Sequence, residues 1–189
     1  EPSNAAAWLA LQGSEPAATT EARAGLVAAQ HFSLHSGVLV QEALQAVPPD
    51  AMPYLRLQVA VLAIGTDLGL GFPGLQPLVA LCTPPPPPGS EQQATCSAVA
   101  RMVVERSDSV LGHAIGTRMG ERAGWPASRL AELHAERKRL DAAMLESPMD
   151  MQQPFSCPSV DRVTQSFRER GELGELAYVR RKAALTERR

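Results

Sequence analysis

The sequence is poor in the residues that build β-sheets. Aromatic residues make up only 4% of its 189 residues, and Val, Ile and Thr are spread too thinly to supply a set of strands. Ala, Leu, Arg, Glu and Gln, which favour helices, are common instead. We therefore predict an all-α fold.

The sequence also lacks a long apolar run and a marked excess of charge of either sign. No stretch of 18 consecutive apolar residues occurs, so no membrane-spanning helix is predicted. The formal net charge is −2, whereas nucleic-acid-binding domains normally carry a clustered basic surface. Hydrophobic residues at 44% and charged residues at 20% are ordinary values for a globular protein. We therefore expect a folded chain that neither spans a membrane nor binds nucleic acid.

Two further features bear on the origin of the chain. Lysine is scarce, since Lys138 and Lys182 are the two lysines among 18 basic residues, a bias that we interpret as that of a GC-rich bacterial genome. The chain starts with Glu1 rather than methionine, which indicates that a leader has been removed, either by processing or by deliberate truncation. With a processed leader we expect an exported, periplasmic protein. A cytoplasmic location is the alternative.

Familiar catalytic and metal-binding motifs are missing. The sequence contains no GxSxG, HExxH, SxxK or Walker A pattern. The segment GLGFPG at Gly69–Gly74 fits GxGxxG, but a predicted helix rather than a strand precedes it, and Pro73 removes a backbone donor. His31 and His35 stand four apart without a third ligand in reach. We predict no cofactor and no metal ion, and we nominate no catalytic residue.

Proline and glycine divide the chain into nine or ten predicted helices. Short connections between them favour stacked antiparallel hairpins in a single domain, residues 1–189. A linker at residues 147–155 allows a subdivision into a helical array, 1–146, and a helical hairpin, 156–189. The predicted helices cover approximately residues 5–12, 16–30, 34–46, 53–64, 74–82, 91–106, 108–123, 127–146, 158–170 and 172–187.

Asn4 is the predicted N-cap of the first helix, which ends at Gly13, and Ser90 with Gln93 forms a capping box before the helix at 91–106. Gly171 separates the last two predicted helices.

The segment NAAAWLALQG near the start of the chain resembles the opening of a tetratricopeptide repeat. Trp8 and Leu11 take the tryptophan and leucine places of that motif, and Ala24 takes the small residue of its second helix. The resemblance covers about residues 4–36 and implies a divergent helical-repeat protein, a class that binds other proteins along a concave face. The departures from the motif are Gln12, His31 and Ser36.

Five consecutive prolines separate two of the three cysteines in CTPPPPPGSEQQATC, from Cys82 to Cys96. A polyproline segment of this length extends about 15 Å, and a helix that returns after Gly89 brings Cys96 back beside Cys82. We predict a disulfide between them, with Cys157 free, in an oxidising compartment. The alternatives are another pairing of the three, or buried reduced cysteines.

Four glycines stand four residues apart in GHAIGTRMGERAG. Gly112, Gly116 and Gly120 lie inside a predicted helix, where they cost about 3 kcal/mol relative to alanine. A smooth face at these positions allows another helix to pack closely. The alternative is a groove for a ligand or for a partner helix.

We expect a helical scaffold that binds another protein or peptide, because the opening of the chain resembles a repeat and no catalytic set is present. One alternative is a small-ligand or lipid binder that uses the glycine face. Another is an enzyme whose site is dispersed over several helices.

Overall fold

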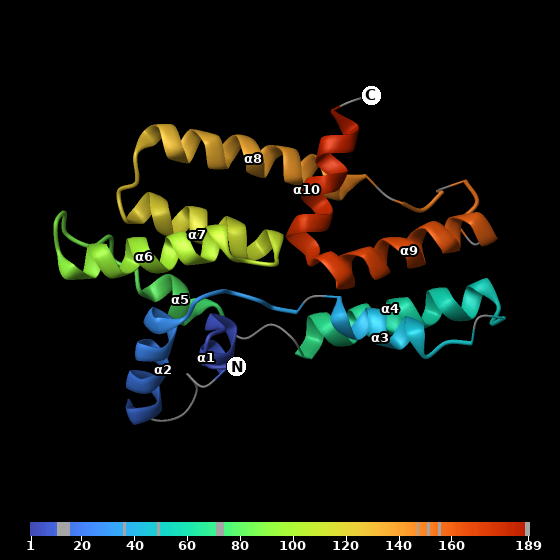
Figure 1. Cartoon of the computed structure of the whole chain (residues 1–189), viewed down its shortest axis with the longest axis horizontal. Helices are drawn as coiled ribbons and strands as arrows, with labels where there is room; N and C mark the ends of the chain where they lie inside the picture. Colours follow the sequence, from blue (N-terminus) through green and yellow to red (C-terminus); the bar gives the residue numbers. More distant parts are fainter. Residues whose placement is uncertain are drawn as a thin grey trace. The chain divides into compact units, whose positions relative to one another are not determined.

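The computed structural model describes residues 1–10, 16–35, 37–48, 50–70, 74–146, 148–150, 152–154 and 156–187. Ten helices and no strand occur in this part of the chain, which confirms the predicted all-α fold and helix number (Figure 1). The helices are α1 (Ala5–Ala10), α2 (Pro16–Ala28), α3 (Val38–Gln45), α4 (Pro53–Leu70), α5 (Gln76–Ala80), α6 (Glu91–Glu105), α7 (Val110–Arg122), α8 (Ala127–Leu145), α9 (Cys157–Leu173) and α10 (Glu175–Thr186).

Helix starts with local caps lie where the sequence predicts them. The Asn4 side chain accepts a hydrogen bond from the backbone N–H of Ala6 at 3.1 Å and thereby caps α1. Ser90 accepts one from the Gln93 N–H at 3.1 Å and caps α6. The predicted end of the first helix, at Gly13, lies outside the described residues, as do Leu11, Gln12 and Ser36 of the repeat-like segment.

The predicted break between the last two helices is wrong. Gly171 lies inside α9, and the chain turns at Gly174, whose φ of 79° is in the region that favours glycine. A Cβ at Gly171 would come within 2.8 Å of Gln41 Cβ on α3. Gly171 therefore permits close packing of α9 on α3 and does not end the helix.

The start of the third helix also differs from the prediction, by four residues. Ser33 and Leu34 are not helical. The Leu34 N–H donates to Asp108 Oδ1 at 3.0 Å, and the Ser33 hydroxyl donates to the other oxygen of the same carboxylate. This tertiary contact holds the segment out of a helix, so α3 begins at Val38.

The chain forms two compact units, each built from two separate stretches. Unit 1 contains residues 1–34 and 72–139, and unit 2 contains residues 35–71 and 140–189. This division differs from a boundary at the linker 147–155. The single domain and its possible subdivision at that linker stay predictions.

Unit 1 is organised around the close pair α6 and α7, which run side by side (Figure 1). The extended segment at residues 31–34 lies between α1 and the α6–α7 turn, with isolated parallel bridges from His31 to Asn4 and from Phe32 to Ser107. The core of this unit includes Leu26, Phe32, Leu78, Val103 and Met119, all buried.

A disulfide joins Cys82, after α5, to Cys96 in the second turn of α6, with the two Cα atoms 5.3 Å apart. Both residues are fully buried, whereas Cys157 is free and exposed. Gly89 turns the chain between the prolines and α6 with a φ of 76°. A rigid extended connection and a returning helix thus bring the two sulfurs together, as the spacing predicts.

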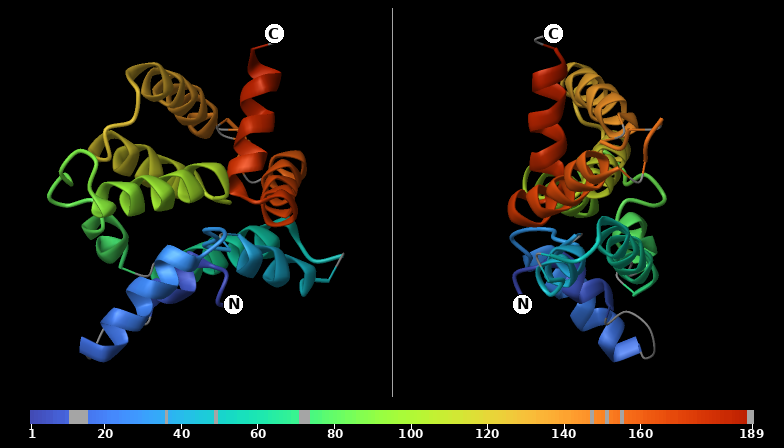
Figure 2. Two further views of the ribbon diagram at one scale, coloured as in Figure 1. Left: turned by 60° about the vertical axis from the view of Figure 1, so that its left-hand side comes forward. Right: turned by 90° about the vertical axis from the view of Figure 1, so that its right-hand side faces the viewer.

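Unit 2 packs α3, α4, α9 and α10 (Figure 2). Val40 and Leu44 of α3 meet Ala60 and Ala63 of α4 in one small core. A second core joins α4 to α9; its buried members are Leu57, Val160 and Val163.

Lys182 on α10 binds backbone carbonyl groups at the C-terminal end of α8. Its Nζ donates to the Ala143 carbonyl in the last turn of α8 at 2.6 Å and to the carbonyl of Glu146, the residue after that helix. Burial lowers the pKa of Lys182, and the nearby Glu146 carboxylate opposes that shift.

Candidate functional site

Gly116 is the point at which α7 meets the backbone of α6. A Cβ added there would lie 2.9 Å from the Val104 backbone nitrogen and 3.1 Å from the Ala100 carbonyl oxygen. Such contacts are closer than van der Waals packing allows. The space in front of Gly116 is therefore filled by the chain itself.

Aromatic rings occupy the space at the other two glycines of this face. A Cβ at Gly112 would lie 2.9 Å from Phe32 Cδ1, and one at Gly120 would lie 2.6 Å from Trp125 Cδ2. Gly112 is thus covered by the extended segment before α3, and Gly120 by the α7–α8 connection. No groove for a ligand or partner helix remains at these three described positions.

Trp125 is held in place by contacts with Gly120, Ser97 and Arg129 of unit 1. One face of its indole lies on Gly120, and its Nε1–H donates to Ser97 Oγ on α6 at 2.8 Å. The Arg129 guanidinium lies over the ring, 4.1 Å from the ring centre, a cation–π geometry. The ring is 8% exposed and forms a fixed platform under Arg129.

Gln93 links three segments beside this platform. Its Oε1 accepts a hydrogen bond from the Gly89 N–H at 2.6 Å, and its Nε2 donates to the Ala123 carbonyl at 2.8 Å. The proline loop, the start of α6 and the end of α7 are therefore joined by one side chain. The sequence predicts its part in the cap of α6 but not its bond to α7.

A cleft of about 490 Å³ lies next to these groups, between the first three turns of α6, the α7–α8 connection and the start of α8. It is large enough for a ligand group, since binding pockets usually measure about 300–1,000 Å³. The residues that line it are Gly89, Ser90, Gln93, Ala94, Ser97, Arg101, Ala123, Gly124, Trp125, Pro126 and Arg129.

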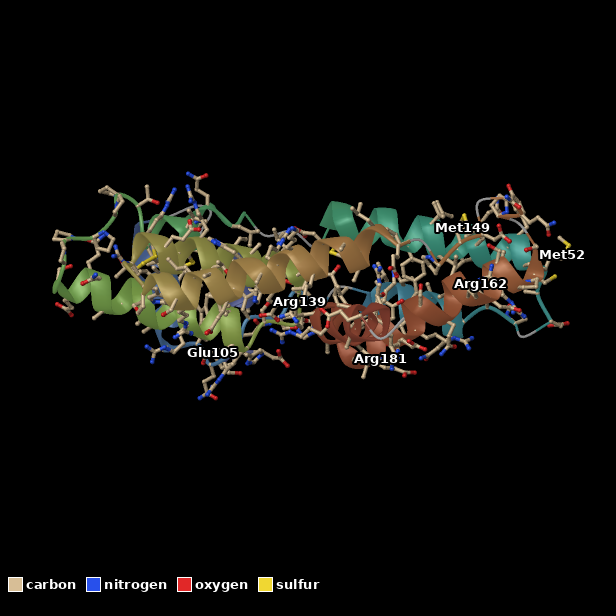
Figure 3. The ribbon with its side chains drawn as sticks, turned by 90° about the horizontal axis from the view of Figure 1, so that it is seen from above. Met52, Glu105, Arg139, Met149, Arg162 and Arg181 are labelled. Atoms are coloured by element: carbon tan, nitrogen blue, oxygen red, sulfur yellow. A yellow bond between two sulfur atoms is a disulfide. The ribbon has the colours of Figure 1, made fainter. Side chains whose placement is uncertain are left out.

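The charge of this cleft has one sign. Among the described residues that line it, Arg101 and Arg129 are the charged ones, and none is a carboxylate. Arg129 donates to Glu105 Oε1 at 2.8 Å, but Glu105 is half exposed and lies at an edge of unit 1 (Figure 3). Arg101 is exposed and has no ionic or hydrogen-bonding partner among the described residues. The cleft therefore favours an anionic occupant.

Two other clefts differ from this one, the first in its mixed charge and the second, which also carries two arginines, in its lack of an aromatic platform. One of about 600 Å³ between α2 and α6 is lined by both Arg23 and Glu91. The other, of about 460 Å³ in unit 2, is lined by Arg56 and Arg168, with no aromatic side chain among its described lining residues. Arg56 already has Asp161 at 3.5 Å.

The four histidines do not form a common site. His31 Nε2 lies 4.0 Å from Glu1 Oε2, and His35 follows it with a φ of 52° outside any helix. His113 is fully buried on α7 with its Nε2 3.3 Å from Glu136 Oε2 on α8. Across the described residues, no three His, Cys, Asp or Glu side chains are arranged to hold a metal ion.

Glu121 joins α7 to α8 through its carboxylate. A hydrogen bond from Arg118 lowers the pKa of Glu121 below its ordinary 4.5; burial opposes the shift, and a bond to His134 Nε2 at 2.8 Å adds to it. The carboxylate therefore stabilises the fold above pH 4.5, and this contribution is lost as the pH falls through the lowered pKa.

We expect Glu121→Gln to lower the free energy of unfolding by up to about 1 kcal/mol at neutral pH, because the pair is partly exposed. The difference from the native chain should shrink as the pH is lowered from 5 to 3. Urea unfolding at several pH values measures it. Glu132→Gln, at an exposed position of α8 without a partner among the described residues, is the control, and an equal loss in both variants would contradict the assignment.

No family model, curated protein or solved structure matches this chain. None of the helices in the described part has both the length and the apolar character needed to cross a bilayer. The geometry of the cleft is therefore the basis for the function proposed below.

Proposed function

We propose that this protein binds an acidic segment of another protein or peptide in the cleft beside Trp125. The observation that carries the proposal is the pair Arg101 and Arg129, which line one cleft with no carboxylate among its described lining residues. An occupant with carboxylates supplies the missing charge. A neutral or basic segment supplies no carboxylate to Arg101, and Arg129 then keeps Glu105 as its one acidic contact among the described residues.

The two arginines contribute in different ways. Arg129 is held in place by Trp125 at 4.1 Å and already contacts one carboxylate, that of Glu105. A guanidinium binds a carboxylate through two parallel hydrogen bonds, so the stacked side chain loses little freedom on binding. Arg101 lies one turn before Glu105 on α6 and lines the same cleft. It has no ionic partner among the described residues, so its guanidinium is available to a ligand.

The volume and polarity of the cleft suit one or two side chains rather than a long stretch of peptide. Ala94, Pro126 and the edge of Trp125 supply apolar contacts, and Ser90 lies at the rim. Charge-assisted hydrogen bonds contribute about 1.5–3 kcal/mol each. Two such contacts give about 3–6 kcal/mol, so we expect dissociation constants between tens of micromolar and several millimolar, and binding that weakens with added salt.

An exported location is part of this proposal. The Cys82–Cys96 disulfide is consistent with an oxidising compartment. Thiol labelling in denaturant of the protein taken directly from its native cells tests this, because the buried Cys82 and Cys96 of a reduced, cytoplasmic protein would then react together with Cys157.

The binding test uses a fluorescein-labelled peptide of alternating Glu and Ala, followed by anisotropy. We expect it to bind, whereas a peptide of Gln and Ala should not. Arg101→Ala should weaken binding about tenfold, since one charge-assisted contact is lost. In a Trp8→Phe background the emission of Trp125 should change on binding, because Trp125 is then the one remaining tryptophan.

Arg23→Ala on α2 is the matched control, because Arg23 is also exposed but lines another cleft. It should bind the acidic peptide as the native chain does. Equal affinity of the Arg101 and Arg23 variants, or unchanged Trp125 emission at saturation, would contradict the proposed site.

A further inference from the structure

Helix α4 in unit 2 carries an apolar face that the unit does not cover. Leu57, Ala60 and Ala63 face the cores with α3 and α9. On the other side, Tyr54 is 55% exposed, Leu55 44%, Val61 59% and Leu62 71%. Met52, just before the helix, is labelled in Figure 3 at the end of unit 2. A helix that is apolar on all sides normally has neighbours on all sides.

This exposed face is uncharged. Between residues 54 and 66 the one charged residue is Arg56, which is partly buried and lies 3.5 Å from Asp161 of α9. The exposed polar side chains that remain are Gln58 and Thr66. The face therefore offers no counterion to a charged partner. Two copies of the face can meet without charge repulsion.

The order of residues on this face is symmetric about Gln58. Tyr54 and Leu55 precede it by four and three residues, and Val61 and Leu62 follow it by three and four. Positions three and four apart lie on one side of a helix. An antiparallel pair related by a two-fold axis requires this symmetry, because residues before the centre meet residues after it in the other copy.

We propose that α4 pairs with α4 of a second copy, antiparallel, about a two-fold axis at Gln58. Tyr54 then faces Leu62 of the other copy, and Leu55 faces Val61. The Gln58 amide, which has both a donor and an acceptor, pairs with its own counterpart. A polar residue at the centre of an apolar helix pair specifies its register.

The area available indicates a reversible dimer. Each side chain of this size carries roughly 60–120 Å² of apolar surface, and between 44% and 71% of each residue is exposed. The four residues of each of two copies therefore bury on the order of 300–500 Å² in total. Permanent dimers bury more than about 1,200 Å² in total. We therefore expect monomer at about 10 μM and substantial dimer at several hundred μM.

Sedimentation velocity of the full chain over this concentration range tests the pairing. Gln58→Glu and Gln58→Lys should each raise the dimer dissociation constant at least tenfold, because like charges meet at the axis. An equimolar mixture of the two variants should associate at least as tightly as the native chain. Leu62→Glu should be monomeric, whereas Leu185→Glu on α10, a leucine also 55% exposed, should dimerise normally.

Circular dichroism confirms that each variant is folded. A native chain that stays monomeric at 1 mM would overturn the proposal. So would a mixture of the two Gln58 variants that fails to associate although the native chain does, since the contact then does not place Gln58 on a two-fold axis. Arg101→Ala should leave the dimer unchanged, so this result is independent of peptide binding.

Discussion

Loss of the Cys82–Cys96 disulfide is expected to lower the free energy of unfolding by up to about 3 kcal/mol. The bond closes a loop with a sequence separation of 14, and a loop of that length restricts the unfolded chain by about this amount. The five prolines already stiffen the unfolded loop, so the measured loss should lie somewhat below the full value. Urea unfolding of the double variant Cys82→Ala, Cys96→Ala measures it.

Two comparisons separate the crosslink from the side chains that form it. The native chain unfolded in the presence of a reductant should lose stability by a similar amount, although its side chains are complete. Cys157→Ala should change stability by less than about 0.5 kcal/mol, because Cys157 is exposed and unbridged. An oxidised native chain no more stable than the reduced one would show that the bond contributes nothing.

Gly116→Ala is expected to destabilise the protein by about 1–3 kcal/mol, although alanine favours helices. The new methyl group would meet the Val104 nitrogen at 2.9 Å and the Ala100 carbonyl at 3.1 Å, and backbone atoms of a packed helix do not move aside easily. Thermal or urea unfolding measures the loss. The strain at this contact should outweigh the gain of about 1 kcal/mol in helix propensity.

The control for this substitution is Gly65→Ala on α4. Gly65 is also helical, but a Cβ there has no atom within 4 Å. We expect this variant to be more stable than the native chain by up to about 1 kcal/mol. Changes of the same sign in both variants would contradict the close contact of α7 with α6.

Features governed by neighbours in the sequence were predicted well. The caps at Asn4 and Ser90 depend on residues two or three positions away. The Cys82–Cys96 pairing follows from a short rigid connection whose length is known from backbone geometry. The abundance of helix-forming residues over the whole chain determines the all-α class.

The cleft was not predicted, because its parts come from three segments. Arg101 lies on α6, Trp125 in the α7–α8 connection and Arg129 on α8. Nothing in the residues around Arg101 indicates that an aromatic ring lies nearby. Trp125 and Arg129 stand four residues apart in the sequence and form a cation–π contact in the structure. This spacing was a local signal that the sequence analysis missed.

Glycine shows where the sequence alone is ambiguous. Gly171 and Gly174 are three residues apart, and either can end a helix, but the chain turns at Gly174 while Gly171 packs on α3. The sequence by itself therefore determined the class of fold, the capped helix starts and the disulfide, because backbone propensity and short-loop geometry act over a few residues. The tertiary structure decided which glycines turn, what fills the face of α7 and where two arginines share a cleft, because those outcomes depend on contacts between segments far apart in the chain.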